Sequence, residues 1–136
     1  MLRRARFDDI EPIRELINQN LDKVLPRTAD ELRELLDMVW VVDENHAIVG
    51  CCVLEVYSPK IAELRSLVVR EDCRGKGYGE MLVHVATEEA QRRRIRQVLV
   101  VTSTREFFEK LNFGPALNEK YALFWMGGND PGHNAT

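Results

Sequence analysis

The sequence predicts one α/β domain of the α+β type, with a mixed, mostly antiparallel central sheet and flanking helices. The chain has 136 residues, of which 45% are hydrophobic and 30% are charged, enough for one core and a polar surface. Three β-type runs follow one another with short links, so antiparallel pairing is expected. A strand, a helix and a further strand come next, and such a crossover joins parallel strands.

We expect this single domain to span residues 1–125. Residues 126–136 lack core-forming side chains and are expected to form a flexible tail. The sequence contains no evident repeat, linker or second domain.

The N-terminal quarter carries a short strand signal and two helix signals. The strand is expected within Leu2–Phe7. Asp8 with Glu11, and Thr28 with Glu31, each have the spacing of a capping box at the start of a helix. Apolar residues recur at helical spacing after each box, so two amphipathic helices are expected.

The middle and the C-terminal parts alternate between β-type and helical patterns. Runs rich in β-branched and aromatic residues predict three strands, and a later apolar run predicts a fourth. The strands are expected at 39–42, 47–57, 62–70 and 97–102. Two more helices are expected, one following the glycine-rich segment at 74–79 and one at 105–111.

Charge and cysteine usage narrow the class of protein. Nineteen basic and 22 acidic residues give a net charge of −3, so neither nucleic acid nor a membrane surface is an expected partner. No apolar run is long enough for a membrane span, and the N-terminus is not a signal peptide. Three cysteines and three histidines show no metal spacing, which predicts no metal and a reducing, cytoplasmic location.

The segment from Arg74 to Gly79 reads Arg-Gly-Lys-Gly-Tyr-Gly and lies between a strand and a helix. Glycine allows positive φ and close approach of a ligand to the backbone. The start of the next helix offers free N–H groups and the positive end of its dipole. Arg74 and Lys76 add positive charge. The segment therefore predicts an anion site suited to a diphosphate.

Other phosphate-binding motifs do not match this segment. The P-loop pattern is absent, and the glycine spacing differs from that of a dinucleotide-binding turn. The alternative is a plain flexible loop before a helix. The preceding strand, the following helix and the flanking Arg74 favour the anion site.

Arg74-x-x-Gly77-x-Gly79 resembles the acetyl-coenzyme A signature of the GNAT family of N-acetyltransferases. Leu67-Val68-Val69 leads into the turn as the central strand of that family does. The stretch from Phe107 to Phe113 is similar to a later helix of the family, and the order of elements agrees over residues 2–125.

This resemblance implies a sheet that splays open beside the strand Leu67–Val69, with acetyl-CoA as co-substrate in the wedge. The pantetheine arm would pair with the backbone of Leu67 and Val69, and the diphosphate would sit on the turn. The implied cofactor-binding residues are Leu67, Val68, Val69, Arg74, Gly75, Lys76, Gly77, Tyr78 and Gly79. Members of the family often dimerise, so a homodimer is a further expectation.

A narrower resemblance is to the acetyltransferase domain of N-acetylglutamate synthases. It is carried by Leu25-Pro26-Arg27-Thr28, by Ala62 to Leu67, and by Thr102 with Phe107-Phe108. It assigns Arg27 and Ser66 to substrate binding. The implied acceptor is a small primary amine, and amino acids such as glutamate are the first candidates.

Transfer to an amine needs a group that accepts a proton, because amines are mostly protonated at neutral pH. Glu63 is the first candidate, and period-two alternation places it on one face with Arg65, Leu67 and Val69. The alternative is a surface carboxylate paired with Arg65 or Lys60, and Glu55 is the reserve candidate. Many family members have a tyrosine where this chain has Phe108, so Tyr121 is the candidate general acid.

Two other functions compete with the enzyme. A non-catalytic module that senses acetyl-CoA would bind the thioester without turnover. The basic cluster at Arg92–Arg96 could bind nucleic acid. Its position at a helix C-terminus, where cations oppose the negative end of the dipole, favours a solvated surface instead.

Overall fold

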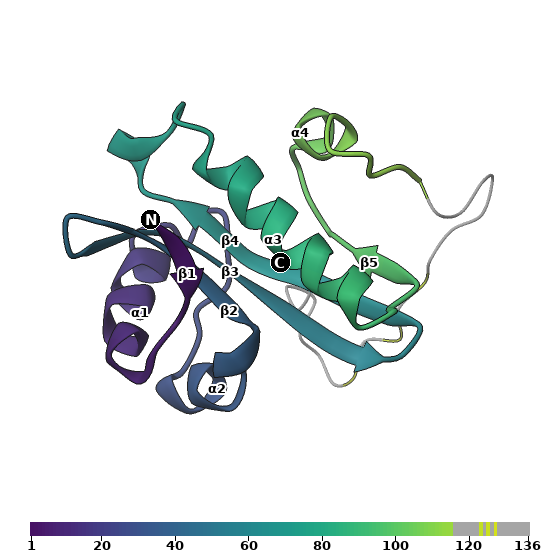
Figure 1. The fold of residues 1–136 in the computed structure, drawn as a ribbon, viewed down its shortest axis with the longest axis horizontal. Helices are drawn as coiled ribbons and strands as arrows, with labels where there is room; N and C mark the ends of the chain where they lie inside the picture. The colour runs from purple at the N-terminus through teal and green to yellow at the C-terminus, as the bar shows by residue number, and fades with distance from the viewer. Residues whose placement is uncertain (116–122, 124, 126, 128–136) are drawn as a thin grey trace.

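The computed structural model describes residues 1–115 and residues 123, 125 and 127. Its centre is a five-stranded sheet whose strands lie side by side in chain order (Figure 1). The first four strands pair antiparallel, and the last two pair parallel. The predicted mixed, mostly antiparallel sheet is therefore confirmed. The strands are β1 (Leu2–Arg4), β2 (Val39–Glu44), β3 (Ala47–Ser58), β4 (Ile61–Val69) and β5 (Gln97–Leu99).

Helices flank the sheet, and the longest one provides the crossover between the parallel strands β4 and β5. Of the box predicted at the start of α2, the N-cap half is confirmed, because Thr28 Oγ1 accepts a hydrogen bond of 3.1 Å from the Glu31 N–H. The Glu31 side chain pairs with Arg27 Nη1 instead of returning to Thr28. The helices are α1 (Ile10–Asn18), α2 (Ala29–Glu34), α3 (Tyr78–Arg92) and α4 (Arg105–Glu109), with 3-10 turns η1 (Phe7–Asp9), η2 (Leu36–Met38) and η3 (Glu71–Cys73).

The capping box predicted between Asp8 and Glu11 is wrong. The turn η1 precedes α1, and the backbone N–H of Arg6 donates to Asp9 Oδ2 at 2.7 Å. The Arg3 guanidinium donates to both oxygens of the Asp9 carboxylate, at 2.7 and 3.0 Å. This ion pair joins β1 to η1. A tertiary contact therefore determines that Asp9, and not Asp8, accepts the backbone hydrogen bond at this turn.

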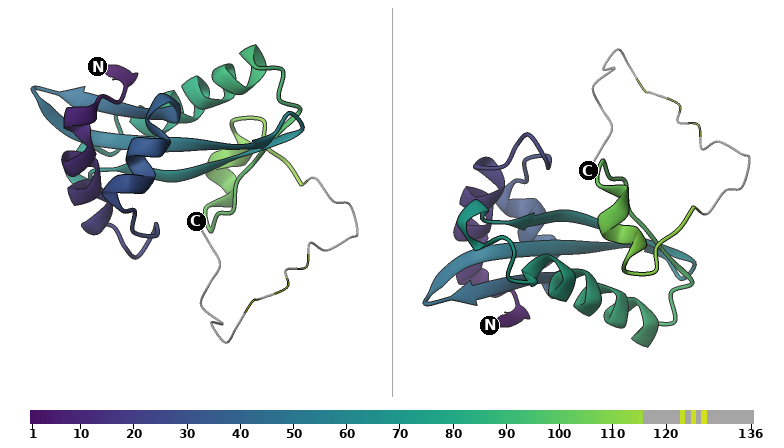
Figure 2. Two further views of the ribbon diagram at one scale, coloured as in Figure 1. Left: turned by 90° about the horizontal axis from the view of Figure 1, so that it is seen from below. Right: turned by 90° about the horizontal axis from the view of Figure 1, so that it is seen from above.

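The sheet separates two hydrophobic cores, and Figure 2 shows it between α3 on one side and α1 with α2 on the other. Cys52 and Leu54 of β3 lie in the core under α3. Cys51 and Val53 lie in the core under α1 and α2. Neighbouring residues of β3 thus point to opposite faces, as strand geometry requires.

β4 contains a bulge at Ser66. Its φ of 54° is left-handed, and the pairing with β3 shifts there. Val53 lies opposite Arg65, whereas Cys51 lies opposite Val68. β4 therefore carries one residue more than β3 over this stretch, which is the definition of a bulge.

The bulge reverses which residues of β4 share a face. The prediction that Glu63 lies on one face with Arg65, Leu67 and Val69 is correct only for Arg65. Leu67 and Val69 pack against the core under α3. Glu63 lies directly opposite Glu55 on β3. Glu55 is two residues from Val53, whose side chain lies in the core under α1 and α2, so Glu55 and Glu63 are on that face of the sheet. Strict alternation fails because the extra residue breaks the period of two.

β4 and β5 separate after a short contact. They pair only over Ile61–Glu63 and Gln97–Leu99, so the predicted strand at 97–102 is shorter than expected. Within the described residues, the second half of β4 has no strand partner on this side. The splay implied by the family resemblance is therefore present.

Two further predictions concern the C-terminal tail and membrane-spanning helices. The expected tail, residues 126–136, lies outside the described residues except for Gly127, so the domain boundary stays a prediction. Among the described helices, none combines the length and the apolar character needed to cross a membrane.

Candidate functional site

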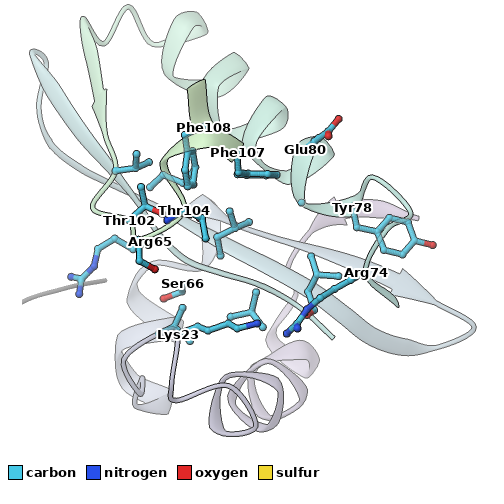
Figure 3. Close-up of a pocket in the computed structure, with 18 of the residues that line it drawn as sticks. Lys23, Arg65, Ser66, Arg74, Tyr78, Glu80, Thr102, Thr104, Phe107 and Phe108 are labelled. Atoms are coloured by element: carbon cyan, nitrogen blue, oxygen red, sulfur yellow. Dashed lines mark hydrogen bonds between the residues drawn. The ribbon is translucent and has the colours of Figure 1, made fainter. Parts of the chain in front are cut away.

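A pocket of about 860 Å³ opens where β4 and β5 separate. The second half of β4 forms one wall, and the segment after β5 together with α4 forms another. Figure 3 shows Phe107 and Phe108 on one side, with Ser66 and Lys23 across from them. The loop before α3 lies at the end of the pocket that contains Arg74 and Tyr78.

The loop before α3 forms a concave turn of backbone N–H groups, which we call the nest (residues 75–80). Gly75 and Gly77 both have a φ of 84°, which glycine adopts without strain. Gly77 is the N-cap of α3, and the first helical bond runs from the Met81 N–H to its carbonyl. Within the described part of the chain, no acceptor contacts the N–H groups of residues 75–80.

The third glycine of the motif has a different role. A Cβ atom at Gly79 would lie 3.4 Å from Cζ of Phe107, whereas one at Gly75 or Gly77 would meet nothing within 4 Å. Gly79 therefore allows α3 to approach α4 closely. The first two glycines are required by backbone conformation, because the nest needs positive φ at both positions.

Arg74 is not a free charge at the rim of the pocket. Its Nε donates to the carbonyl of Val69 at 3.1 Å, and its Nη2 donates to Asn20 Oδ1 at 3.1 Å. Asn20 is buried, and its amide nitrogen donates to the carbonyl of Leu16. The guanidinium thus joins the end of β4 to the end of α1 and fixes the entrance to the nest.

Lys76 and Tyr78 are tied to the hairpin between β2 and β3. The Lys76 Nζ lies 3.4 Å from both carboxylate oxygens of Glu44, and the Tyr78 hydroxyl donates to the same carboxylate. The hydrogen bond from Tyr78 lowers the pKa of Glu44, and the carboxylate raises the pKa of Lys76. Lys76 does not line the pocket.

On the side of the splay, the backbone of Leu67 and the N–H of Val69 are available within the described residues, whereas the Val69 carbonyl accepts a hydrogen bond from Arg74 Nε. The Arg70 N–H donates to the carbonyl of Val49 on β3. Backbone groups of an antiparallel strand alternate in direction, so those of Leu67 and Val69 point away from β3. The side chain of Val68 lies in the core under α1 and α2. These groups can pair with an extended ligand.

Polar side chains gather around the bulge on the face of α2, and we call Arg27, Glu55, Arg65 and Ser66 the bulge cluster. Arg27 Nε donates to Ser66 Oγ at 2.9 Å. Arg27 Nη2 lies 2.7 Å from Glu55 Oε1, and Arg65 Nη1 lies 3.6 Å from the same oxygen. Arg65 and Ser66 also line the pocket, whereas Arg27 does not.

Glu63 lies beside this cluster and outside the lining of the pocket. The Tyr57 hydroxyl donates to Glu63 Oε1 at 2.6 Å and lies 3.4 Å from Glu55 Oε2. Burial and the hydrogen bond to Glu63 raise the pKa of Tyr57, so its hydroxyl keeps its proton. Tyr57 therefore holds one carboxylate oxygen of Glu63 in place.

The structure places most of the predicted cofactor-binding residues together. Tyr121, the candidate general acid, lies outside the described residues. No group of metal-binding side chains occurs within the described ranges. The predicted cofactor-binding residues that line the pocket are Leu67, Val68, Val69, Arg74, Gly75, Gly77, Tyr78 and Gly79.

Sequence reasoning missed Lys23, Thr104 and Glu44. Lys23 and Thr104 line the pocket, and Thr104 is held by a hydrogen bond of 2.9 Å from its N–H to Thr102 Oγ1. Lys23 carries no local signal, since it lies in an irregular segment after α1. Glu44 ends β2 just before the turn, and only the folded sheet brings it to the nest.

A family model described as an acetyltransferase (GNAT) domain matches residues 36–115. The chain belongs to the GNAT acetyltransferase family. The match runs from before β2 to beyond α4, so it includes the splayed strands and the nest. The GNAT domain is therefore an acetyltransferase.

Two relatives align with most of the GNAT domain. An uncharacterized N-acetyltransferase of Chlorobaculum tepidum is 30% identical over 114 residues, which cover 82% of this chain and 74% of the relative. An amino-acid acetyltransferase of Mycobacterium tuberculosis is 28% identical over 117 residues, covering 83% of this chain and 67% of the relative. Against the amino-acid acetyltransferase of Serratia proteamaculans, 27% identical, the alignment covers only 27% of the relative.

Solved structures share the fold. A crystal structure of a Mycobacterium tuberculosis protein in complex with CoA and a second ligand superimposes with a TM-score of 0.79. Its identity is 25%, and the match covers 87% of this chain and 76% of that chain. N-acetylglutamate synthase from Neisseria gonorrhoeae, complexed with coenzyme A and N-acetyl-glutamate, has a TM-score of 0.76 at 23% identity, over 82% of this chain and 27% of that chain.

Proposed function

We propose that this GNAT domain transfers the acetyl group of acetyl-CoA to the primary amine of an amino acid. The observation that carries the proposal is the pocket at the splay, which ends at backbone N–H groups without acceptors in the described part of the chain. Relatives named amino-acid acetyltransferase, and a structural neighbour crystallised with N-acetyl-glutamate, support an amino acid as acceptor.

The nest fits a diphosphate by its chemistry. Six consecutive N–H groups, at residues 75–80, are available as donors, and the 15-residue helix α3 adds the positive end of its dipole. The backbone of Leu67 and Val69 would pair with the pantetheine arm, in the position that a longer β5 would otherwise take. Acetyl-CoA supplies the activated acetyl group in this arrangement.

The acceptor amine must lose a proton before it attacks the thioester. The α-amine of an amino acid has a pKa of about 8, so most of it is protonated at neutral pH. Because Glu63 does not line the pocket, in the proposal it accepts this proton through water, and backbone N–H groups of the splayed strand stabilise the oxyanion. The reaction forms no covalent enzyme intermediate. Tyr121 stays a predicted general acid, and Phe108 has no proton to donate.

The carboxylate of the acceptor would meet the bulge cluster. Ser66 and Arg65 line the pocket, and Arg27 fixes the Ser66 hydroxyl through its Nε. Guanidinium groups bind carboxylates with charge-assisted hydrogen bonds. Arg27 and Ser66 thus serve the acceptor in this proposal, with Arg27 acting through Ser66.

The proposal is tested by measuring release of free CoA thiol from acetyl-CoA with each of the standard amino acids, with a polyamine and with a short peptide. We expect thiol release with amino acids and no release with the polyamine. A reaction without acceptor controls for hydrolysis of the thioester. Thermal stabilisation by acetyl-CoA without thiol release from any acceptor would reject the proposal in favour of a sensor.

A further inference from the structure

The bulge cluster contains a partly buried carboxylate, Glu55, that the proposed reaction does not use. Glu55 Oε1 lies 2.7 Å from Arg27 Nη2 and 3.6 Å from Arg65 Nη1. The exposed fraction is 7% for the Arg27 side chain and 16% for the Glu55 side chain. Because little solvent screens these charges, Glu55 offsets much of the charge of both guanidinium groups.

The two arginines still have hydrogen-bonding capacity. Arg65 Nε and Arg27 Nη2 are enclosed, and in the described part of the chain neither has an acceptor in hydrogen-bond geometry. The contact between Arg27 Nη2 and Glu55 Oε1 is close but lacks hydrogen-bond alignment. Buried donors are almost always hydrogen-bonded in folded proteins. Glu55 Oε1 has no hydrogen-bond partner either and faces Arg27 Nη2, so Arg65 Nε is the donor of the cluster that is left over for a further acceptor group.

The charges of the cluster limit how many carboxylates it can bind. Two arginines and Glu55 leave one net positive charge. Two other carboxylates lie close to the cluster. Glu31 is 3.5 Å from Arg27 Nη1, and Glu63 is linked to Glu55 through the Tyr57 hydroxyl. Arg27, Arg65 and Glu55 alone thus match one carboxylate of an acceptor, and the negative charge of the neighbouring Glu63 disfavours a second.

We propose that Glu55 determines acceptor specificity by restricting this enzyme to amino acids that carry a single carboxylate. The inference rests on the proposed function and narrows its substrate class, against the expectation that glutamate comes first. The side-chain carboxyl of glutamate has a pKa of about 4.3 and is ionised at neutral pH. Glu55 does not itself line the pocket, but it lies 3.6 Å from Nη1 of Arg65, which does. A second carboxylate bound at Arg65 would therefore meet the like charge of Glu55, which disfavours binding.

L-Glutamine and L-glutamate test this proposal, because they have the same shape and differ by one charge. The readout is the ratio of kcat/KM for the two acceptors, measured by thiol release at saturating acetyl-CoA. We expect the wild-type protein to prefer glutamine by at least about tenfold. Glu55→Gln removes the charge and keeps the size of the side chain, so the ratio should move toward glutamate by about tenfold or more.

Glu31→Gln is the matched control. Glu31 contacts the same arginine, but its side chain is 47% exposed, so its charge is screened and the ratio should change less than about twofold. Thermal unfolding and affinity for CoA check that each variant is folded. If Glu55→Gln does not fold, Glu55→Asp keeps the charge and should keep the preference for glutamine.

The outcomes separate this inference from the proposed function. Wild-type protein that prefers glutamate, or a folded Glu55→Gln variant with an unchanged ratio, would overturn the role of Glu55 and leave amino-acid acetylation standing. Binding of acetyl-CoA without acetylation of any amino acid would reject the proposed function, and the inference with it. A shift of the ratio toward glutamate by about tenfold or more, confined to Glu55→Gln, would support both.

Discussion

The nest and the bulge cluster lie at the two ends of one pocket wall, and they are built in different ways. The nest consists of backbone groups from one continuous stretch, residues 75–80, whose shape depends on the positive φ of Gly75 and Gly77. The bulge cluster consists of side chains from three segments, and its central bond joins Arg27 to Ser66 across 39 positions of sequence.

This difference divides the work of the site. Backbone N–H groups bind phosphate oxygens whatever side chains surround them, so the nest should set the affinity for CoA. Charged side chains in a buried cluster select among acceptors, because each charge there acts with little screening. Variants in the nest should therefore change the affinity for CoA, whereas variants in or beside the bulge cluster should change the reaction of the acceptor.

We expect the largest effect from Glu63→Gln. If Glu63 accepts the proton of the amine, its amide replacement should lower kcat at least about 100-fold, since general-base catalysis contributes that much or more. The affinity for CoA should stay within about twofold, because Glu63 does not line the pocket. Thiol-release kinetics and calorimetric titration with CoA measure the two constants. The amide oxygen of the variant can still accept the hydrogen bond from Tyr57, so the fold is preserved.

Glu88→Gln is the control for this experiment. Glu88 is a half-exposed carboxylate on α3 that pairs with His84 and does not line the pocket. Its replacement should leave both kcat and CoA affinity unchanged. A Glu63→Gln variant with wild-type kcat would assign Glu63 to a structural pair with Tyr57 and leave the base to be found elsewhere.

Gly77→Ala should lower the stability or the CoA affinity and leave kcat unchanged, which is the opposite of the result expected for Glu63→Gln. A residue with a Cβ costs about 1–2 kcal/mol in the left-handed conformation, although a Cβ at Gly77 meets no neighbouring atom. Either the loop keeps its shape and the protein loses that stability, or the loop relaxes and CoA binds about tenfold more weakly. The loss of stability measured by urea unfolding and the loss of CoA binding free energy measured by calorimetric titration should together equal this conformational cost. The value of kcat at saturating acetyl-CoA should stay near that of the wild type.

Gly114→Ala is the matched glycine control. A Cβ there also meets nothing within 4 Å, and its φ is not left-handed. The variant should therefore bind CoA like the wild type and unfold at the same urea concentration. Equal losses in Gly77→Ala and Gly114→Ala would mean that backbone conformation does not create the nest.

The same contrast explains what the sequence could predict. The strand, glycine turn and helix are local, so spacing alone located the nest, α3 and the parallel crossover. The antiparallel order of β2, β3 and β4 followed from their short links. These features depend on residues that are neighbours in the chain.

The features that escaped prediction depend on tertiary contacts. The bulge at Ser66 reverses the faces of β4, and a left-handed serine has no distinctive sequence pattern. Arg74 had the right charge for a phosphate site, but Asn20 and the Val69 carbonyl occupy its guanidinium. Glu44 is distant in sequence from the nest that it contacts. Side-chain partners of this kind are decided only when the whole sheet is assembled.

Glu44→Gln should give the smallest effect, and it tests how a single charge near the nest changes the affinity for CoA. Glu44 neutralises Lys76, and both side chains are solvent-exposed enough to be screened, at 28% and 49%. Removing the carboxylate adds one net positive charge near a polyanionic ligand. We expect CoA to bind about two- to threefold more tightly at low salt, and this gain should vanish near 1 M salt, where the Debye length is about 3 Å.

The pH dependence of that difference has a defined sign. The hydrogen bond from Tyr78 and the nearby Lys76 lower the pKa of Glu44, so the wild-type carboxylate stays charged below the ordinary glutamate value of about 4.3. The difference in CoA affinity between wild type and Glu44→Gln should therefore persist from pH 8 to about pH 5. It should disappear only as the pH falls through the lowered pKa. Weaker binding by the variant would instead show that Glu44 shapes the loop, and side chains would then share in building a site that we assign to the backbone.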